Sequence, residues 1–337
     1  MNFTRRGFVT AGVVSLGASS ASLLPRMAIA QSPPGVLRVA PSGDTTGEDD
    51  RIAIQGAIDT LEARDPVTLE VTGGGIVELD PGNYYLDQRL SVHNRVRIRG
   101  NNGRTTEIMP GSAFSDSYMF EFRNERMVSG VAQQVSQFNC RLEELSIRPL
   151  GNSSITAAVW ARSWNEQCGL RNVLIWEYMK HAVLFTDGFG GTATFELREC
   201  EFMSAGNAST SYPGLFFTTP HTVGYTNAVL EHVIVSGPSS PAGYTCIEAR
   251  NGLNLIVTGG HVEQCEYGIY MTNRSNLTLT GFTGSPTGVT NLIGCAGDFS
   301  GTVFGSAVLK AGATGHVLRD NKLGNHITSE QNPLVFP

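Results

Sequence analysis

The fold class follows from one stretch of the chain, Gly73-Gly74-Gly75-Ile76-Val77-Glu78-Leu79-Asp80-Pro81-Gly82-Asn83-Tyr84-Tyr85-Leu86. Apolar and polar residues alternate in it over a few positions before Gly, Asn or Pro breaks the run. Such short runs predict short strands, each followed by a turn. A strand of this length cannot bury an inner face alone, so the pattern predicts a coil in which further copies of the same unit stack.

Similar segments recur through the rest of the chain. The pattern apolar-x-x-apolar-x-apolar begins at successive offsets of 28, 27 and 33 residues, at Leu142, Leu170, Leu197 and Leu230. A second short strand is expected after each copy, at 158–162, 182–186, 214–218, 246–250 and 268–272. Two alternating strand types at a period a little above twenty residues are typical of a solenoid.

One helix is expected ahead of the coil, between about residues 50 and 64. Apolar residues recur there at helical spacing, at Ile54, Ile58 and Leu61. Asp49 or Asp50 can cap its first turn. A single short helix in a strand-rich chain fits a cap at one end of the coil better than a layer of helices.

This N-terminal region resembles a known superfamily. The glycine run, Val77-x-Leu79-x-Pro81-x-x-x-Tyr85 and Val96-x-Ile98-x-Gly100 follow the expected helix in an order similar to that of pectate-lyase-like β-helix proteins. That group includes phage tailspikes, rhamnogalacturonases and polysaccharide lyases. The resemblance covers about residues 43–108 and implies an all-β fold, a single-stranded right-handed parallel β-helix (solenoid) with a short N-terminal capping α-helix. It also makes a homotrimer an expectation.

Residues 1–30 have the features of an export signal. Thr4-Arg5-Arg6-Gly7-Phe8-Val9 places paired arginines ahead of an uncharged stretch, and Ala28-Ile29-Ala30 offers small residues for cleavage. That stretch is rich in Gly, Ala and Ser and is shorter than the ~20 strongly apolar residues of a transmembrane span. We therefore predict a twin-arginine signal peptide, a parallel β-helix domain over residues 31–337, and a periplasmic or extracellular location without membrane contact after cleavage.

The composition limits the classes of partner and cofactor. The net charge is −6, and no basic cluster interleaved with aromatic residues is present, which argues against a nucleic-acid partner. Between residues 140 and 300 the only aspartates are Asp187 and Asp298. A calcium site is disfavoured because it needs several converging oxygens. We expect no metal and no cofactor, and the six cysteines leave both disulfides and buried free thiols open.

Alternation assigns the faces of the second strand type. If Val159 and its counterparts point inward, the residues that follow them point outward and form two columns. One column contains Trp160, Leu184, Phe216, Glu248 and Tyr270, and the other contains Arg162, Thr186, Thr218, Arg250 and Thr272. Aromatic faces bind sugar rings and arginine binds carboxylates, so we predict Trp160, Arg162, Arg250 and Tyr270 as substrate-binding residues. The alternative is that outward aromatics pack under the long connections.

The turn Glu177-Tyr178-Met179-Lys180-His181 supplies catalytic candidates. Elimination on a uronate needs a cation to neutralise the sugar carboxylate, a base for the C5 proton and an acid for the leaving oxygen. Lys180, His181 and Tyr178 are the residue types for these three roles, and we place Glu177 among the substrate-binding residues. The alternative is a solvated turn in which His181 only caps the next strand.

Two further residues complete the catalytic set. Glu248 can act as acid or base, although with Arg250 it can also form an ordinary ion pair. His261 follows a glycine pair in Gly259-Gly260-His261-Val262-Glu263, a turn that we expect in such coils whatever their activity, so its role stays open.

We therefore predict a polysaccharide-degrading enzyme, a lyase that cleaves an acidic, uronate-containing polysaccharide by β-elimination. The scarcity of aspartate pairs and the outward arginines favour elimination. One alternative is a glycoside hydrolase that uses a glutamate pair such as Glu177 and Glu248. A uronate epimerase, which needs the same groups as a lyase, and a non-catalytic glycan-binding surface protein are the others.

Overall fold

The computed structural model describes residues 35–162, 164–186, 194–219, 226–251, 253–272 and 276–284, and the backbone of the later strands as far as Ser329. The predicted export signal, residues 1–30, lies outside the described residues. So does the whole connection at 187–193.

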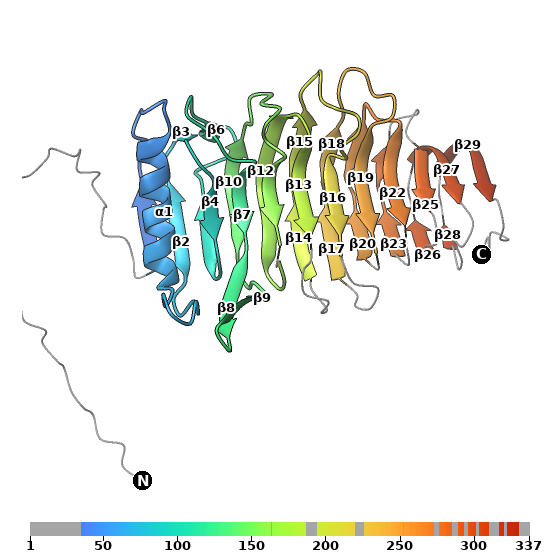
Figure 1. Cartoon of the computed structure of the whole chain (residues 1–337). Coiled ribbons are helices and arrows are strands. Elements are labelled where there is room, and N and C mark those ends of the chain that lie inside the picture. Colours follow the sequence, from blue (N-terminus) through green and yellow to red (C-terminus); the bar gives the residue numbers. More distant parts are fainter. Residues whose placement is uncertain are drawn as a thin grey trace, which may run out of the picture.

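The strands form three stacks along one axis, and successive coils follow one another from the blue end to the red end of Figure 1. Stack A consists of β1 (Val36–Val39), β2 (Gly75–Leu79), β5 (Val96–Arg99), β10 (Arg141–Ile147), β12 (Cys168–Tyr178), β14 (Thr194–Arg198), β17 (Thr226–Glu231), β20 (Leu253–Thr258), β23 (Asn276–Thr280), β26 (Ala296–Ser300) and β28 (Val317–Arg319). Stack B consists of β3 (Gly82–Leu86), β6 (Thr106–Pro110), the second halves of β10 and β12, β15 (Glu201–Ser204), β18 (Ile234–Ser236), β21 (His261–Glu263) and β24 (Thr283–Gly284). Stack C consists of β4 (Leu90–Val92), β7 (Tyr118–Phe122), β11 (Ala157–Ala161), β13 (His181–Thr186), β16 (Leu215–Thr218), β19 (Thr245–Arg250), β22 (Tyr267–Thr272) and β25 (Val289–Leu292), and β27 (Val303–Leu309) and β29 (Lys322–Ser329) continue stacks B and C.

All pairings within these stacks are parallel in the described part of the chain. The chain therefore winds as a parallel β-helix, and the predicted fold class is confirmed. One antiparallel hairpin, β8 (Asn124–Val128) with β9 (Val131–Val135), projects from the coil (Figure 1).

The strand register confirms the predicted inner face of stack C. Val159 pairs with Val183, and Leu215, Ile247 and Ile269 occupy the same position on the next three strands. We call this row of five side chains the inner file. All five side chains are fully buried. One apolar side chain per coil therefore lies directly above the next, and each coil completes the burial of its neighbour.

Aromatic rings join stacks A and C across the interior. The ring centroid of Phe195 in β14 lies 4.4 Å from that of Phe185 and 5.5 Å from that of Phe217, both in stack C. Trp164, in the turn between the two stacks, lies 5.6 Å from Phe195. Offset aromatic contacts of this kind add to the burial of their large apolar surfaces.

The predicted helix is present as α1 (Glu48–Glu62), which covers the open end of the first coil (Figure 1). Ile54 and Ile58 are fully buried, and Leu61 is nearly so. They face β1, β2 and β3, whose first edge would otherwise expose apolar side chains to water. The described residues contain no helix with the length and apolarity needed to cross a bilayer.

The cap of α1 differs from the prediction. The carboxylate of Asp44, in the turn before the helix, accepts hydrogen bonds from three backbone N–H groups of the first turn at 3.1–3.3 Å. The expectation that Asp49 or Asp50 caps the helix was wrong. Asp50 is fully buried, and its carboxylate instead accepts the backbone N–H groups of Ser42 and Tyr85, which ties α1 to the first coil.

The cap can be tested with two isoleucines of the same helix. Ile58 is fully buried and Ile52 is 51% exposed. We expect Ile58→Ala to lower the free energy of unfolding by about 2–5 kcal/mol, because it leaves a cavity between α1 and the first coil. Ile52→Ala should change it by less than about 0.5 kcal/mol. Equal losses in urea denaturation followed by circular dichroism would show that α1 does not seal the coil.

Candidate functional site

The outer face of stack C, named the platform here, carries the two predicted columns. Trp160, Leu184, Phe216, Glu248 and Tyr270 lie in register on successive strands. At about 4.8 Å between neighbouring strands this column is about 19 Å long. The second column is in register from Thr186 through Thr218 and Arg250 to Thr272, so the predicted arrangement is confirmed for these four residues, whereas Arg162 follows the last paired residue of β11.

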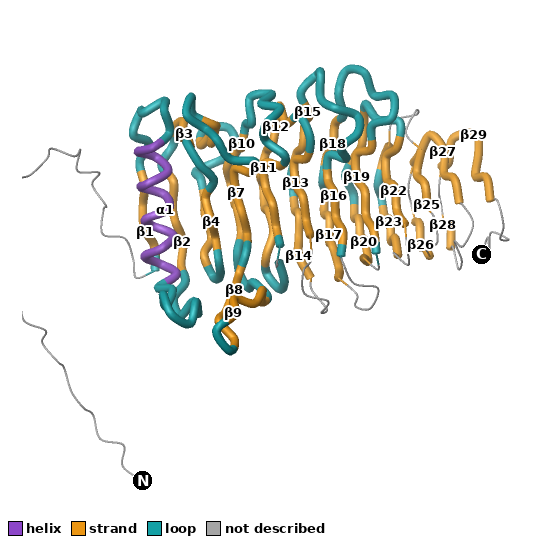
Figure 2. The backbone as a smooth tube through the Cα atoms, in the orientation of Figure 1, coloured by secondary structure: helices purple, strands orange, loops and turns teal. Residues whose placement is uncertain are grey.

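The longer connections stand at one edge of the platform. Strands β13, β16, β19 and β22 lie side by side, and the loops at 205–214 and 237–244 rise above them (Figure 2). Residues of the first loop contact β13, as described below. The middle of the platform is therefore bordered by loop residues from the next coil.

Phe216 lies at the centre of a cluster on the platform. The His181 ring stacks beside it, with centroids 5.6 Å apart and an interplanar angle of 22°. The guanidinium carbon of Arg250 lies 5.1 Å from the Phe216 ring centroid, and Arg250 also bonds the carboxylate of Glu248. Three residues predicted from separate parts of the sequence, His181, Glu248 and Arg250, are thus brought together.

His181 is held as a neutral base. Its Nδ1 lies 2.6 Å from the carbonyl oxygen of Pro213, which can only accept, so Nδ1 carries the proton and Nε2 keeps its lone pair. Burial of the ring, which is 6% exposed, lowers the pKa of His181 to about 4, and the nearby charge of Lys180 acts in the same direction. His181 is therefore uncharged at neutral pH, as a general base must be.

Tyr212 is a member of the cluster that the sequence did not indicate. Its ring meets that of His181 edge to face, with centroids 5.4 Å apart, and Lys180 Nζ lies 5.6 Å from the Tyr212 ring centroid. The residue is 36% exposed. Its position in a long insertion gave no periodic signal, because contacts distant in sequence decide where such a loop folds.

Glu248 and Arg250 form a partly shielded ion pair. Arg250 donates from Nε to Glu248 Oε1, and the described residues provide no partner for its terminal NH₂ groups. The Arg250 side chain is 47% exposed, whereas Glu248 is almost covered. Burial raises the pKa of Glu248, and the hydrogen bond and charge of Arg250 oppose that shift. The pair presents a fixed positive group to solvent.

Trp160 and Arg162 form a rigid end of the platform. The Trp160 ring stacks on Tyr118 with centroids 4.3 Å apart, and its Nε1 donates to Thr186 Oγ1 at 3.0 Å. Arg162 lies over the same ring at 5.0 Å. Because Tyr118 covers one face of the Trp160 ring and Arg162 lies over the ring, a substrate can contact the edge of Trp160 and the guanidinium of Arg162, but not an open face of the ring. Tyr270 lies at the other end, next to Glu248 in the column.

Tyr178 does not belong to the platform. It was predicted as the acid for a leaving group, but it is 1% exposed, and its hydroxyl lies 3.0 Å from that of Tyr244 in the interior. Burial raises the pKa of Tyr178. A hydroxyl that is enclosed and already bonded cannot reach a polysaccharide on the outer face, so this assignment is corrected.

Glu177 and His261 also lie away from the cluster. Glu177 lies at the irregularity of β12 between Trp176 and Tyr178, in the part that pairs within stack B, and Arg148 binds both of its carboxylate oxygens at 2.8 and 2.9 Å. His261 belongs to β21 of stack B, where Nδ1 contacts Thr283 Oγ1 at 2.9 Å. Neither residue joins Glu248 on stack C, so the geometry does not support a glutamate pair of Glu177 and Glu248 and does not place His261 in the cluster.

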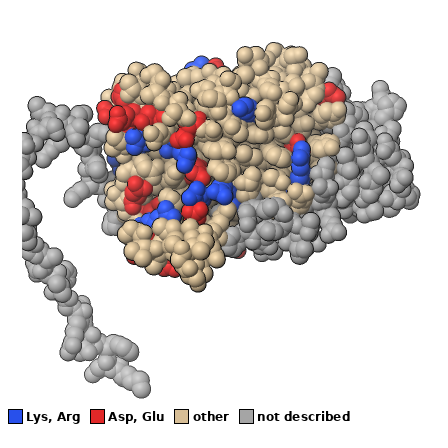
Figure 3. Space-filling view, in the orientation of Figure 1, with Lys and Arg blue, Asp and Glu red and all other residues tan. Residues whose placement is uncertain are grey.

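The platform is sparsely charged. In the space-filling view, acidic and basic side chains gather over the N-terminal coils, whereas the later described coils on this face show a few scattered charged residues of both signs on a mostly uncharged surface (Figure 3). Among the described residues no three His, Cys, Asp or Glu side chains converge as a metal site requires.

No protein-family model and no curated protein matches this chain. Among solved structures it is similar to the A-module of mannuronan C-5 epimerase AlgE4 of Azotobacter vinelandii, with 13% identity and a TM-score of 0.43 over 88% of this chain and 98% of that chain. It is also similar to a DFA-IIIase of Arthrobacter chlorophenolicus A6, with 12% identity and a TM-score of 0.44 over 85% of this chain and 87% of that chain. A third similar structure is the tailspike protein gp49 of Acinetobacter baumannii bacteriophage Fri1, a capsular polysaccharide depolymerase. Its identity is 12% and its TM-score 0.39, over 91% of this chain and 63% of that chain. Similarities at this level assign no reaction to the chain.

The low pKa of His181 predicts a pH-dependent stability. Between its ordinary value of 6.5 and about 4 the unfolded chain binds a proton that the folded chain does not. Neutral His181 therefore makes its full contribution to the free energy of unfolding above pH 6.5. That contribution is lost as the pH falls towards 4, which lowers the free energy of unfolding by about 3 kcal/mol in all. Denaturation at a series of pH values should show a smaller acid loss for His181→Gln than for wild type. The exposed His261→Gln is the control and should follow wild type; identical curves for all three proteins would contradict the assigned state of His181.

Proposed function

We propose that this protein is a carbohydrate-active enzyme that cleaves a uronate-containing polysaccharide by β-elimination on the platform. The observation that carries the proposal is the cluster around Phe216, in which a neutral histidine base and an arginine both contact the Phe216 ring, and the NH₂ groups of that arginine have no partner among the described residues. These are two of the three groups that elimination requires. The twin-arginine signal expected at residues 1–30 supports a periplasmic or extracellular site of action as part of the same proposal.

Arg250 neutralises the uronate in this mechanism. Its terminal NH₂ groups bind the sugar carboxylate, and Lys180 adds a second positive charge at the Tyr212 side of the cluster. Withdrawal of charge from the carboxylate makes the C5 proton more acidic and stabilises the negative charge that develops when it leaves. Glu248 holds the guanidinium through Nε and so acts as a positioning residue.

His181 takes the C5 proton at Nε2. The electron pair of that C–H bond forms the C4–C5 double bond, and the bond from C4 to the glycosidic oxygen breaks. The departing oxygen needs a proton, and the hydroxyl of Tyr212, whose ring contacts His181 from the adjoining loop, is the candidate donor. Tyr212 thus takes the role that the sequence had suggested for the buried Tyr178.

Hydrolysis is less well supported. A glycoside hydrolase needs two carboxyl groups on either side of the scissile bond. Glu177 is bound by Arg148 on another stack, and Glu248 is the one carboxylate in the described cluster. Epimerisation uses the same base and cation and differs in that a proton returns to C5, so experiment must separate it from elimination.

A panel assay separates these activities. The mature protein is incubated with uronate-containing and with neutral polysaccharides. Elimination produces an unsaturated uronate that absorbs in the ultraviolet, which is the expected result. New reducing ends without that absorbance would indicate hydrolysis, deuterium uptake from D₂O without chain cleavage would indicate epimerisation, and binding alone would indicate a non-catalytic protein. Each of these three outcomes contradicts the proposal.

Matched histidine and tyrosine pairs test the assignment of roles. We expect His181→Gln to lower the rate of elimination by about 10²–10⁴-fold, because the base is removed while an amide can still bond Pro213. His261→Gln, on stack B, should keep the rate.

Tyr212→Phe should likewise slow elimination, whereas Tyr178→Phe should keep the rate and lose about 1 kcal/mol of stability with the bond to Tyr244. If the rate of elimination falls more in His261→Gln than in His181→Gln, or more in Tyr178→Phe than in Tyr212→Phe, the active site does not lie at the cluster around Phe216.

A further inference from the structure

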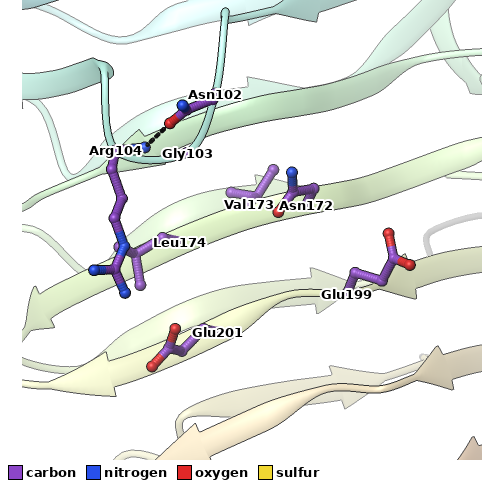
Figure 4. A pocket seen from close by; sticks show the side chains of 8 residues that line it. All are labelled: Asn102, Gly103, Arg104, Asn172, Val173, Leu174, Glu199 and Glu201. Carbon is purple, nitrogen blue, oxygen red and sulfur yellow. Dashed lines mark hydrogen bonds between the residues drawn. The ribbon is translucent and has the colours of Figure 1, made fainter.

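A pocket of about 340 Å³ opens away from the platform, at the corner where stack A turns into stack B (Figure 4). Arg104 and Asn102 reach it from the turn at 101–105, which overhangs β12. Leu174 of β12 and Glu201 of β15 line the part below that turn, and Glu199 lies further along. The lining residues therefore come from three coils, and the turn at 101–105 reaches β12 across the intervening coil of β10.

The pocket exists because the corners of the coil differ in length. In the later coils a single residue with positive φ makes the corner, such as Asn172 at 49° or Glu199 at 54°. The turn at 101–105 is longer and extends over its neighbours. It is also fixed, because Asn102 Oδ1 accepts the backbone N–H of Arg104 at 2.7 Å (Figure 4), and Asn172 is held by its bond to Glu144 at 2.5 Å. The walls are preformed.

Its charged side chains are not used by the fold. Elsewhere on the coil, carboxylates are commonly paired, as Glu177 is with Arg148 and Glu231 is with Arg198. Within the described residues no hydrogen bond or ion pair engages the side chains of Glu199, Glu201 or Arg104. The pocket thus presents two acceptor groups and one five-donor group around an aliphatic floor.

We propose that this pocket is a second carbohydrate-binding site, distinct from the platform, which takes a neutral sugar residue. Carboxylates accept hydrogen bonds from sugar hydroxyls, Arg104 and the Asn side chains donate to sugar oxygens, and Leu174 contacts the C–H face of the ring. Two carboxylates against one guanidinium leave the site negative, which disfavours a uronate. The pocket therefore favours a neutral sugar, whereas Arg250 on the platform favours a uronate.

The surface next to the pocket extends this site. Glu201 is in register with Ile234 of the next coil, and Ile234 with His261 of the one after. Ile234 is 36% exposed although it is apolar. A glycan seated in the pocket would continue along stack B, with the apolar face of the following sugar on Ile234. The site requires only this surface and does not depend on elimination at the platform.

Calorimetric titration of the mature protein tests the proposal. The probes are the neutral pentasaccharides of cellulose, xylan, mannan and galactan, with trigalacturonate as the acidic probe. We expect at least one neutral probe to bind, and Glu201→Gln and Arg104→Ala each to weaken it by roughly ten-fold, as loss of a charge-assisted hydrogen bond does. Glu166→Gln, an exposed carboxylate outside the pocket, is the matched control and should bind as wild type.

Three outcomes would overturn the proposal. The first is that no neutral probe binds, and the second is that both pocket variants bind the neutral probe as wild type does. The third is that Glu201→Gln weakens the binding of trigalacturonate, because removal of a carboxylate should leave that binding unchanged or strengthen it. His181→Gln should bind the neutral probe as wild type does, so loss of elimination and loss of this site are separately visible. Circular dichroism of all the variants checks that the coil is intact, and the side chains changed in the two pocket variants are solvent-accessible.

Discussion

The structure depends on parallel backbone hydrogen bonding between successive coils in register. This pairing sets each strand about 4.8 Å above the last and repeats the same inward and outward positions from coil to coil. Residues about thirty positions apart in sequence therefore become neighbours. His181, Phe216 and Arg250 come from three consecutive strands of stack C and meet for this reason alone. The buried file from Val159 to Ile269 is the inner counterpart of that column.

Most of the fold could be predicted because it follows from two periods in the sequence. Alternation at period two assigned faces, and the repeat of a little over twenty residues implied stacking, so both the inner file and the outer columns were located. The helix cap was missed because a side chain ahead of the helix competed for the same N–H groups. Asp44 reaches three of them, while Asp50 is drawn inward by Ser42 and Tyr85.

The site was predicted in part, and the errors share a cause. Residues with positive φ at the corners, such as Glu177 and the pair Gly259 and Gly260, redirect the chain from one stack to the next, and alternation cannot be carried through them. Tyr178 consequently points into the core, and His261 begins a strand of stack B. Tyr212 was missed because its insertion has no period, and its place is fixed by contacts with His181 and Lys180.

The most direct test of the central claim is a crystal structure of the Tyr212→Phe protein with a uronate oligosaccharide. We expect a glycan along strands β11 to β22, with one sugar carboxylate on the NH₂ groups of Arg250 and the C5 hydrogen of that sugar facing Nε2 of His181. A uronate bound on stack A or B, with the cluster around Phe216 left empty, would contradict it.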